Sequence, residues 1–139
     1  MIEVVDALRE AQALVMSKAT ENAESAETVL LGAGEFLFRE GDLADALYIV
    51  RKGLLRIVSG STVYETVRPG GIIGEMGIVD EGGRRSASAI AGSRSELEKI
   101  DTPAFLTLIR TKPDFALEVM RVMSRRLRVM NQRYRQDQR

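Results

Sequence analysis

The sequence predicts a mainly β fold, an eight-stranded antiparallel sandwich or barrel with helices at both ends. Glycines recur every 7 to 12 residues between positions 34 and 92, so turn signals are frequent in the middle of the chain. Short β-rich runs lie between these turns, and they do not alternate with helices as βαβ units would. We expect one domain, with an N-terminal helical segment at 1–27, a β unit at 28–101 and C-terminal helices at 102–139.

Eight strands are expected in the β unit. Their residues are 28–31, 36–39, 46–51, 54–59, 62–67, 72–73, 86–91 and 95–100. Ser59-Gly60-Ser61 predicts a tight hairpin between the fourth and fifth strands, and Glu40-Gly41-Asp42 predicts another turn. Short strands at this spacing are typical of antiparallel sheets.

Helices are expected on both sides of the β unit. Residues 2–17 have the apolar spacing of an amphipathic helix. Thr102 is a suitable N-cap with Pro103 at the first helical position, so a second helix begins there. Pro113 ends that helix and starts a long terminal one.

The terminal helix carries an apolar seam. Its members are separated by 4, 3, 4, 3 and 4 residues, which is a heptad repeat: Ala116, Met120, Met123, Leu127, Met130 and Tyr134. A second apolar line of Phe115, Val119 and Val122 suits contact with the β unit. Parallel pairing with a second copy would bury the seam, so we expect a homodimer. The alternative is a monomer whose terminal helix folds back as a lid over a pocket.

Composition limits the chemistry that the chain can perform. It has 139 residues but neither cysteine nor histidine, which excludes disulfides, thiolate or histidine metal sites and catalysis by either side chain. We therefore expect no enzyme activity, no catalytic residues, no metal and no cofactor. No charge-free run approaches the ~20 residues needed to cross a bilayer, and the acidic start is unlike a signal peptide. This predicts a cytoplasmic protein without a membrane partner.

Charge is unevenly distributed although the net charge is zero. Residues 110–139 contain nine Lys or Arg against three Asp or Glu, a net +6, so the rest of the chain carries −6. A basic tail is typical of an arm for nucleic acid or for an acidic surface. We favour the simpler explanation, a solvated helix face beside an acidic body.

A glycine-rich stretch is the strongest candidate binding site. Six of the twelve glycines lie between positions 70 and 83, and Gly74-Glu75-Met76-Gly77 predicts one short helical turn entered through glycine, which suits an anion. Ten residues after Glu75, Arg85-Ser86-Ala87 offers a guanidinium, a hydroxyl and backbone amides, a set that suits a phosphodiester. Glu75 would accept hydrogen bonds from a sugar hydroxyl. The alternative is a glycine-rich hairpin with a surface ion pair between Glu75 and an arginine.

Four motifs in register extend this interpretation: GEFLFREGD at 34–42, ALYIVRKG at 46–53, GEMG at 74–77 and RSA at 85–87. Together they resemble the cyclic-nucleotide-binding domain family, above all its catabolite-activator-type members, over roughly residues 28–135. The resemblance implies a β-roll of the double-stranded β-helix or jelly-roll type with a phosphate-binding cassette at 74–87. It implies that Glu75 accepts the ribose 2′-hydroxyl and that Arg85, rather than Arg84, pairs with the cyclic phosphate. The other ligand contacts implied in the cassette come from Gly74, Met76, Gly77, Ser86 and Ala87.

Two departures from the family pattern concern specificity and output. Met130-Asn131 stands where the catabolite-activator branch has Thr-Ser beside the purine, so Asn131 would bind a base edge and Met130 would make apolar contact. The branch resemblance favours cAMP, with cGMP as the alternative. The sequence also stops at Arg139, before the helix-turn-helix domain that such regulators carry, so we expect no DNA binding by this chain.

The sequence therefore predicts a regulatory module that senses a cyclic nucleotide and signals through its C-terminal helix to an unidentified effector. The alternative is a β-roll scaffold with an empty pocket, used for dimerisation or partner binding. Intact Glu75 and Arg85 favour the sensor, because a pocket that has lost its function has no reason to keep a guanidinium buried and unpaired.

Overall fold

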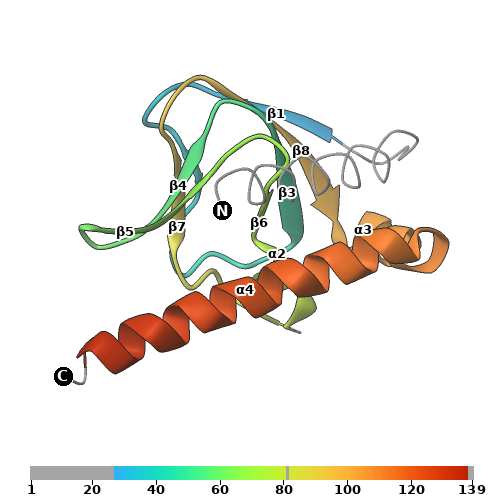
Figure 1. Cartoon of the computed structure of the whole chain (residues 1–139). Coiled ribbons are helices and arrows are strands. Elements are labelled where there is room, and N and C mark those ends of the chain that lie inside the picture. The colour runs from blue at the N-terminus through green and yellow to red at the C-terminus, as the bar shows by residue number, and fades with distance from the viewer. Residues whose placement is uncertain (1–26, 81, 138–139) are drawn as a thin grey trace, which may run out of the picture.

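The computed structural model describes residues 27–80 and 82–137. Two four-stranded antiparallel sheets form the predicted roll, and two helices run along one side of it (Figure 1). The helix predicted at 2–17 lies outside the described residues. Within the described ranges, no helix is both long enough and apolar enough to span a membrane.

The eight strands divide equally between the two sheets. The first sheet has the order β1-β8-β3-β6, with β1 at Glu27–Leu31, β8 at Ser95–Asp101, β3 at Ala46–Lys52 and β6 at Ile72–Ile73. The second has the order β2-β7-β4-β5, with β2 at Phe36–Phe38, β7 at Ser88–Ala91, β4 at Leu55–Ser59 and β5 at Thr62–Val67. Every predicted strand is confirmed to within two residues at each end. The predicted hairpin is confirmed as well, with Gly60 at a φ of 59° between β4 and β5.

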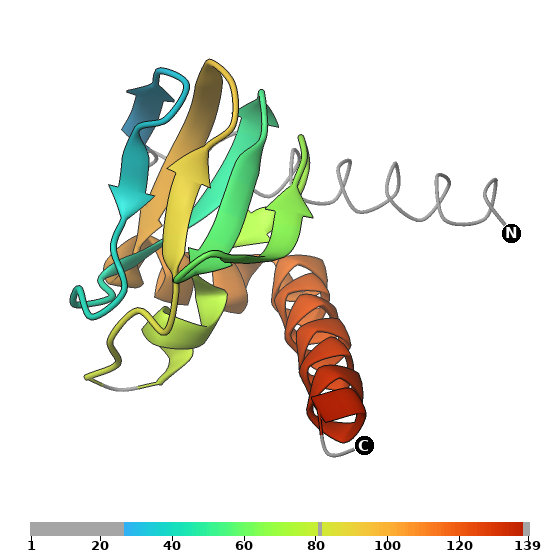
Figure 2. The same cartoon turned by 90° about the vertical axis from the view of Figure 1, so that its left-hand side faces the viewer.

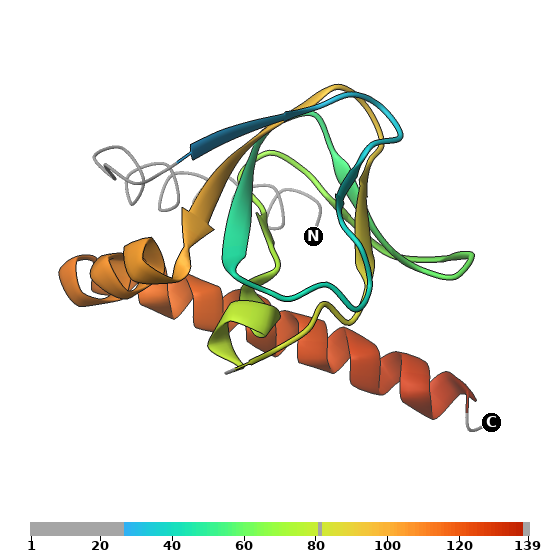
Figure 3. The ribbon, with the colours of Figure 1, turned by 180° about the vertical axis from the view of Figure 1, so that it is seen from behind.

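Strand β3 is buried on both faces and separates two cores. It pairs with β8 on one side and with β6 on the other. Because side chains alternate along a strand, Ala46, Tyr48 and Val50 point into the roll, whereas Leu47 and Ile49 point towards the helices. Figure 3 shows the helices running beneath the roll, at the end where β3 begins and β8 ends. Burial on both faces explains why the first five residues of β3, 46–50, are a continuous apolar run without alternation.

The helical layer consists of α3, Thr102–Thr111, and α4, Pro113–Asp137. The predicted cap of α3 is wrong by one residue. The N-cap is Asp101, whose Oδ1 accepts a hydrogen bond from the Ala104 N–H at 2.9 Å, while Thr102 is already helical. The carboxylate reaches the N–H of the third helical residue, so it provides the cap that the hydroxyl was expected to provide.

One line of α4 residues fastens this helix to the roll. Phe115, Val119 and Val122 are buried against the first sheet, which confirms the predicted second apolar line. Four members of the predicted seam are exposed, namely Met120, Leu127, Met130 and Tyr134. Met123 is an exception, because it is partly buried against the same core. Figure 2 shows α4 below the roll, and Arg133 near the C-terminal end of the helix still donates to the carbonyl of Tyr64 on β5 at 2.6 Å.

Candidate functional site

The glycine-rich cassette begins with a left-handed residue between β6 and a single helical turn, α2, at Glu75–Val79. Gly74 occupies the N-cap with φ 85°, a backbone conformation that residues with a Cβ rarely adopt. A Cβ at Gly74 would also collide with Nη1 of Arg85. Glycine is therefore needed here for two reasons, the turn itself and the close approach of the arginine.

Arg85 lies beneath this turn as a buried cation and is only 5% exposed. Its Nη1 donates to the carbonyl of Gly74 at 2.9 Å, and its Nη2 donates to the carbonyl of Ala46 at 2.6 Å. Its Nε has no hydrogen-bond partner among the described residues, and its guanidinium stacks 4.2 Å from the centre of the Phe38 ring. Burial lowers the pKa of Arg85 below its usual value, partly offset by the charges of Tyr48 and nearby acids. The structure thus holds a desolvated cation by two neutral carbonyls and an aromatic ring, without an ion pair to a described carboxylate.

Arg84 has a different environment from its neighbour. Its side chain is exposed, and Nη1 donates to the carbonyl of Gly41 at 2.9 Å in the loop between β2 and β3. The same loop holds the backbone of Arg85, whose N–H donates to the carbonyl of Asp42 at 2.8 Å. Of the two arginines, only Arg85 is directed into the cassette.

Glu75 is the buried acidic residue of the cassette, with 1% exposure. Both of its carboxylate oxygens accept from Nη1 of Arg126, each at 2.5 Å. Its partner is therefore an arginine from α4, fifty-one residues away, and the pair is buried. The sequence also allowed a surface ion pair between Glu75 and an arginine, as the alternative to a binding site. The observed pair differs from that alternative because it is buried.

Arg126 connects α4 with three other segments of the molecule. Its Nε and Nη2 donate to the two carboxylate oxygens of Glu65 on β5, at 3.1 and 2.8 Å. Nη2 also donates to the carbonyl of Ile72 on β6 at 2.6 Å, while Nη1 binds Glu75 on α2. Burial alone would lower the pKa of Arg126, but the hydrogen bonds and charges of Glu65 and Glu75 outweigh it, and the net shift is upward. Arg126 is consequently a permanent cation at neutral pH.

Arg126 and Glu65 were not among the predicted site residues. A signal for Arg126 exists in the sequence, because it continues the line 115, 119, 122, 126 whose other members face the core. A charged residue on the buried line of a helix requires a buried partner. No comparable signal points to Glu65, which lies in an ordinary polar strand.

The remaining predicted site residues are mostly exposed. Ser86 and Met76 lie at the surface of the cassette, while Gly77 is packed tightly against Ala44. Met130 and Asn131 are exposed on α4, and the structure gives Asn131 no side-chain hydrogen bond to the described residues of the cassette. The structure therefore brings Gly74, Glu75 and Arg85 together, and it does not join Met130 or Asn131 to them.

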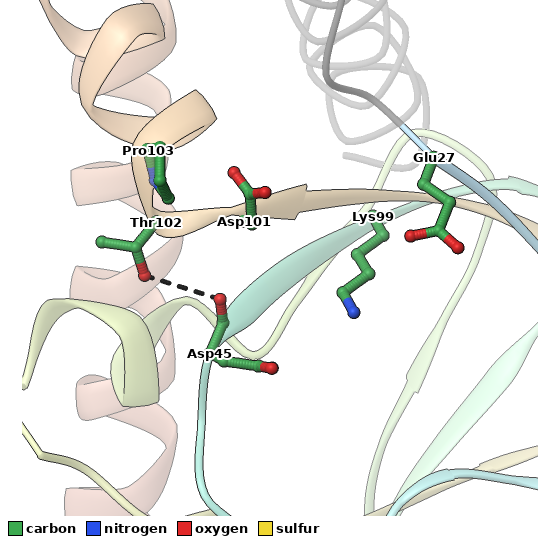
Figure 4. A pocket seen from close by; sticks show the side chains of 6 residues that line it. All are labelled: Glu27, Asp45, Lys99, Asp101, Thr102 and Pro103. Carbon is green, nitrogen blue, oxygen red and sulfur yellow. Dashed lines mark hydrogen bonds between the residues drawn. The ribbon is translucent and has the colours of Figure 1, made fainter.

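Two hollows lie near these elements. One, of about 360 Å³, is lined by Glu27, Asp45, Lys99, Asp101, Thr102 and Pro103 at the junction of the roll with α3 (Figure 4). None of these residues belongs to the predicted site. The other, of about 270 Å³, lies between residues 65–72 and α4, and both Glu65 and Arg126 line it.

Comparison with known proteins agrees with the observed fold. The profile described as "Cyclic nucleotide-binding domain" matches residues 28–112. The chain is 37% identical over 100 residues to the cyclic AMP receptor protein of Thermus thermophilus. The aligned region covers 68% of this chain and 46% of that protein. It is 31% identical over 107 residues to lysophospholipase nte1 of Neurospora crassa, over 73% of this chain and 7% of that enzyme. The crystal structure of Thermus thermophilus catabolite activator protein superposes with a TM-score of 0.73 at 31% identity, over 84% of this chain and 57% of the other.

The match extends across the roll and includes the cassette. The chain spans less than half the length of either of the two relatives named by sequence, so the likeness concerns this domain alone. With the family profile covering more than half of the residues, and with the predicted roll confirmed strand by strand, the chain belongs to the cyclic nucleotide-binding domain family.

Proposed function

We propose that this chain is a regulatory sensor module that binds a cyclic nucleotide, in the first instance cAMP, at the cassette. One observation carries the proposal: Arg85 is a buried cation whose hydrogen bonds go to neutral carbonyls, with Nε unpartnered among the described residues. A buried charge is costly unless an opposite charge accompanies it. The cyclic phosphate of a nucleotide would supply that charge and accept a charge-assisted hydrogen bond.

The sugar would occupy the neighbouring part of the cassette. Glu75 is buried beside Gly74, whose carbonyl already receives Arg85, so the two charged groups lie on either side of one turn. A carboxylate is a strong acceptor for a ribose hydroxyl. In the proposed complex the phosphate lies against Arg85, with Ser86 and Ala87 beside it, and the 2′-hydroxyl lies against Glu75.

The identity of the base is the finer part of the proposal. cAMP is supported by the relative named cyclic AMP receptor protein. Met130 and Asn131 would contact the base if a bound ligand draws α4 closer, with cGMP as the alternative ligand. We propose the same helix as the output, because Arg126 already ties it to Glu75 in the cassette. The effector that would respond is unidentified, and the cytoplasmic location stays a prediction.

A second copy of the chain is proposed as the partner of α4. Met120, Leu127, Met130 and Tyr134 are exposed at heptad spacing and have no cover among the described residues. Parallel pairing of two such helices would bury them and place both cassettes beside the same pair of helices.

One observation favours the alternative function, a scaffold that binds no nucleotide. Glu75 is already neutralised by Arg126, so the sugar half of the site is closed without a ligand. Binding, rather than catalysis, is the proposed role under either alternative.

A thermal-shift panel of cAMP, cGMP, a cyclic dinucleotide and AMP decides between the two functions. We expect cAMP to bind with micromolar affinity, and at 100 times its Kd to stabilise the chain by about 2.7 kcal/mol. Arg84→Ala is the control for a change of Arg85, and it should keep the rise in melting temperature caused by cAMP. The scaffold is correct if none of the four compounds raises the melting temperature at millimolar concentration.

A further inference from the structure

Glu65 occupies an unusual position for a strand residue at the edge of a sheet. Its side chain is 40% exposed, yet both carboxylate oxygens are engaged by the same guanidinium from α4. The contact uses Nε and Nη2 of Arg126, the side of the guanidinium that forms two parallel hydrogen bonds with a carboxylate. This arrangement fixes the plane of the guanidinium as well as its position.

The bonds to Glu65 limit the hydrogen-bond donors of Arg126 that can reach other groups. Nη2 uses its second hydrogen on the carbonyl of Ile72, so Nη1 is the single nitrogen that remains, and it is directed at Glu75. A free arginine side chain would lose rotamer entropy on adopting one such pose. Because Glu65 already holds the guanidinium in one orientation, this entropy is lost on folding and not on ligand binding.

A hydroxyl group needs both an acceptor for its hydrogen and a donor for its lone pair. Glu75 provides the acceptor, and Nη1 of Arg126, which donates to both Glu75 oxygens in this structure, would turn one hydrogen to the hydroxyl. A ligand with hydrogen in place of that hydroxyl could form neither bond, although Glu75 and Arg126 would keep their bonds to each other. Discrimination would then come from the two hydrogen bonds that only the hydroxyl can form.

We propose that Glu65 is a positioning residue for the sugar half of the site, aiming Arg126 at Glu75 so that the two together recognise the ribose 2′-hydroxyl. This inference rests on the proposed function, since it concerns the same ligand. Among the described residues, the side-chain hydrogen bonds of Glu65 go to Arg126, so its effect would reach the ligand through that residue.

The test compares the affinity for a cyclic nucleotide with the affinity for its 2′-deoxy analogue. Both are measured by calorimetry on the full chain and on Glu65→Gln, a variant of nearly the same shape without the charge. The unmodified chain should prefer the ribose form by about tenfold or more. In Glu65→Gln we expect this preference to fall to about twofold, mainly through weaker binding of the ribose form. Glu65→Asp, which keeps the charge but loses reach, should be intermediate.

The matched control is Glu98→Gln, which removes the carboxylate of another partly exposed ion pair of the roll, with Arg51 at 3.0 Å. It should leave the preference at its original value. A preference unchanged in Glu65→Gln, or an equal loss of affinity for both ligands, overturns the positioning role while leaving nucleotide binding intact. Failure of the unmodified chain to bind any cyclic nucleotide overturns both proposals, so the two failures are distinguishable. Arginine side-chain NMR of Arg126 gives a readout without ligand, in which rotation about the Nε–Cζ bond should be faster in Glu65→Gln than in the control.

Discussion

The two halves of the cassette hold their charged groups in opposite ways. Arg85, in the phosphate half, is buried without a counter-ion and is held by the carbonyls of Gly74 and Ala46. Glu75, in the sugar half, is buried with a counter-ion that α4 supplies. The first half is thus electrostatically incomplete without a ligand, whereas the second is already complete. We infer that the phosphate would provide most of the attraction, and that the sugar would provide selectivity by competing with or joining an existing pair.

The largest effect should come from breaking the completed half. Arg126→Leu leaves Glu75 buried without its cation, which is expected to cost about 3–5 kcal/mol of folding stability. Urea unfolding at pH 7 measures this loss. Arg121→Gln is the control on the same helix, because Arg121 is exposed and its i,i+3 pair with Glu118 should be worth less than about 1 kcal/mol.

The double variant Arg126→Leu with Glu75→Leu shows whether the loss comes from the orphaned charge. Removing both charges should recover much of the stability, since two apolar side chains tolerate burial. If the double variant is as unstable as the single one, the pair matters for its shape and hydrogen bonds instead of its charge balance.

In the incomplete half the expected effect is on binding. Arg85→Ala should reduce affinity for the cyclic nucleotide by roughly 30- to 150-fold, which corresponds to about 2–3 kcal/mol of charge-assisted hydrogen bonding. Folding stability should change much less than in Arg126→Leu, because Arg85 balances no described carboxylate. Calorimetric titration measures the affinity, and Arg84→Ala should be close to the unmodified chain. Equal losses for the two arginines would contradict the assignment of the phosphate to Arg85.

The same contrast explains how far the sequence could predict the site. The phosphate half is local: Gly74 and Arg85 are eleven residues apart, and glycine enrichment marks the turn that joins them. The sugar half depends on contacts between residues that are distant in sequence. Arg126 is 51 positions from Glu75 and 61 positions from Glu65. Spacing within a strand or a helix carries no information about which strand a helix will cross. The strands were predictable for the same local reason, since turns bound each of them. The misassigned cap of α3 shows that local signals fix the start of a helix only to within one residue.

A smaller effect separates the turn at Gly74 from its contact with Arg85. Gly74→Ala introduces a Cβ at a positive φ, which costs about 1–2 kcal/mol, and adds a collision with Nη1 of Arg85. Gly41→Ala is the control, because Gly41 has a φ of 91° but open space around its Cβ direction. Thermal unfolding of both variants should show that Gly74→Ala loses more stability than Gly41→Ala. Equal losses would mean that Arg85 moves aside easily and is not held rigidly beneath the turn.

The smallest effect on the folded monomer is expected at the exposed seam of α4, and it tests whether the sugar half depends on a second copy. Leu127→Glu changes an exposed residue next to Arg126 in sequence, so the stability of the monomer should change by no more than about 0.5 kcal/mol. A parallel helix pair would bury this position, and a pair of opposed carboxylates there would separate it. Sedimentation should therefore show a dimer for the unmodified chain at high micromolar concentration and a monomer of about 15.4 kDa for the variant. Met123→Glu is unsuitable for this purpose, because Met123 packs partly against the roll and its loss would disturb the core as well.

Arg128→Glu, also exposed on α4 but outside the seam, is the control and should leave the association unchanged. A monomer in every case would reject the dimer, and the contact of Arg126 with Glu75 would then favour α4 as the lid of its own cassette.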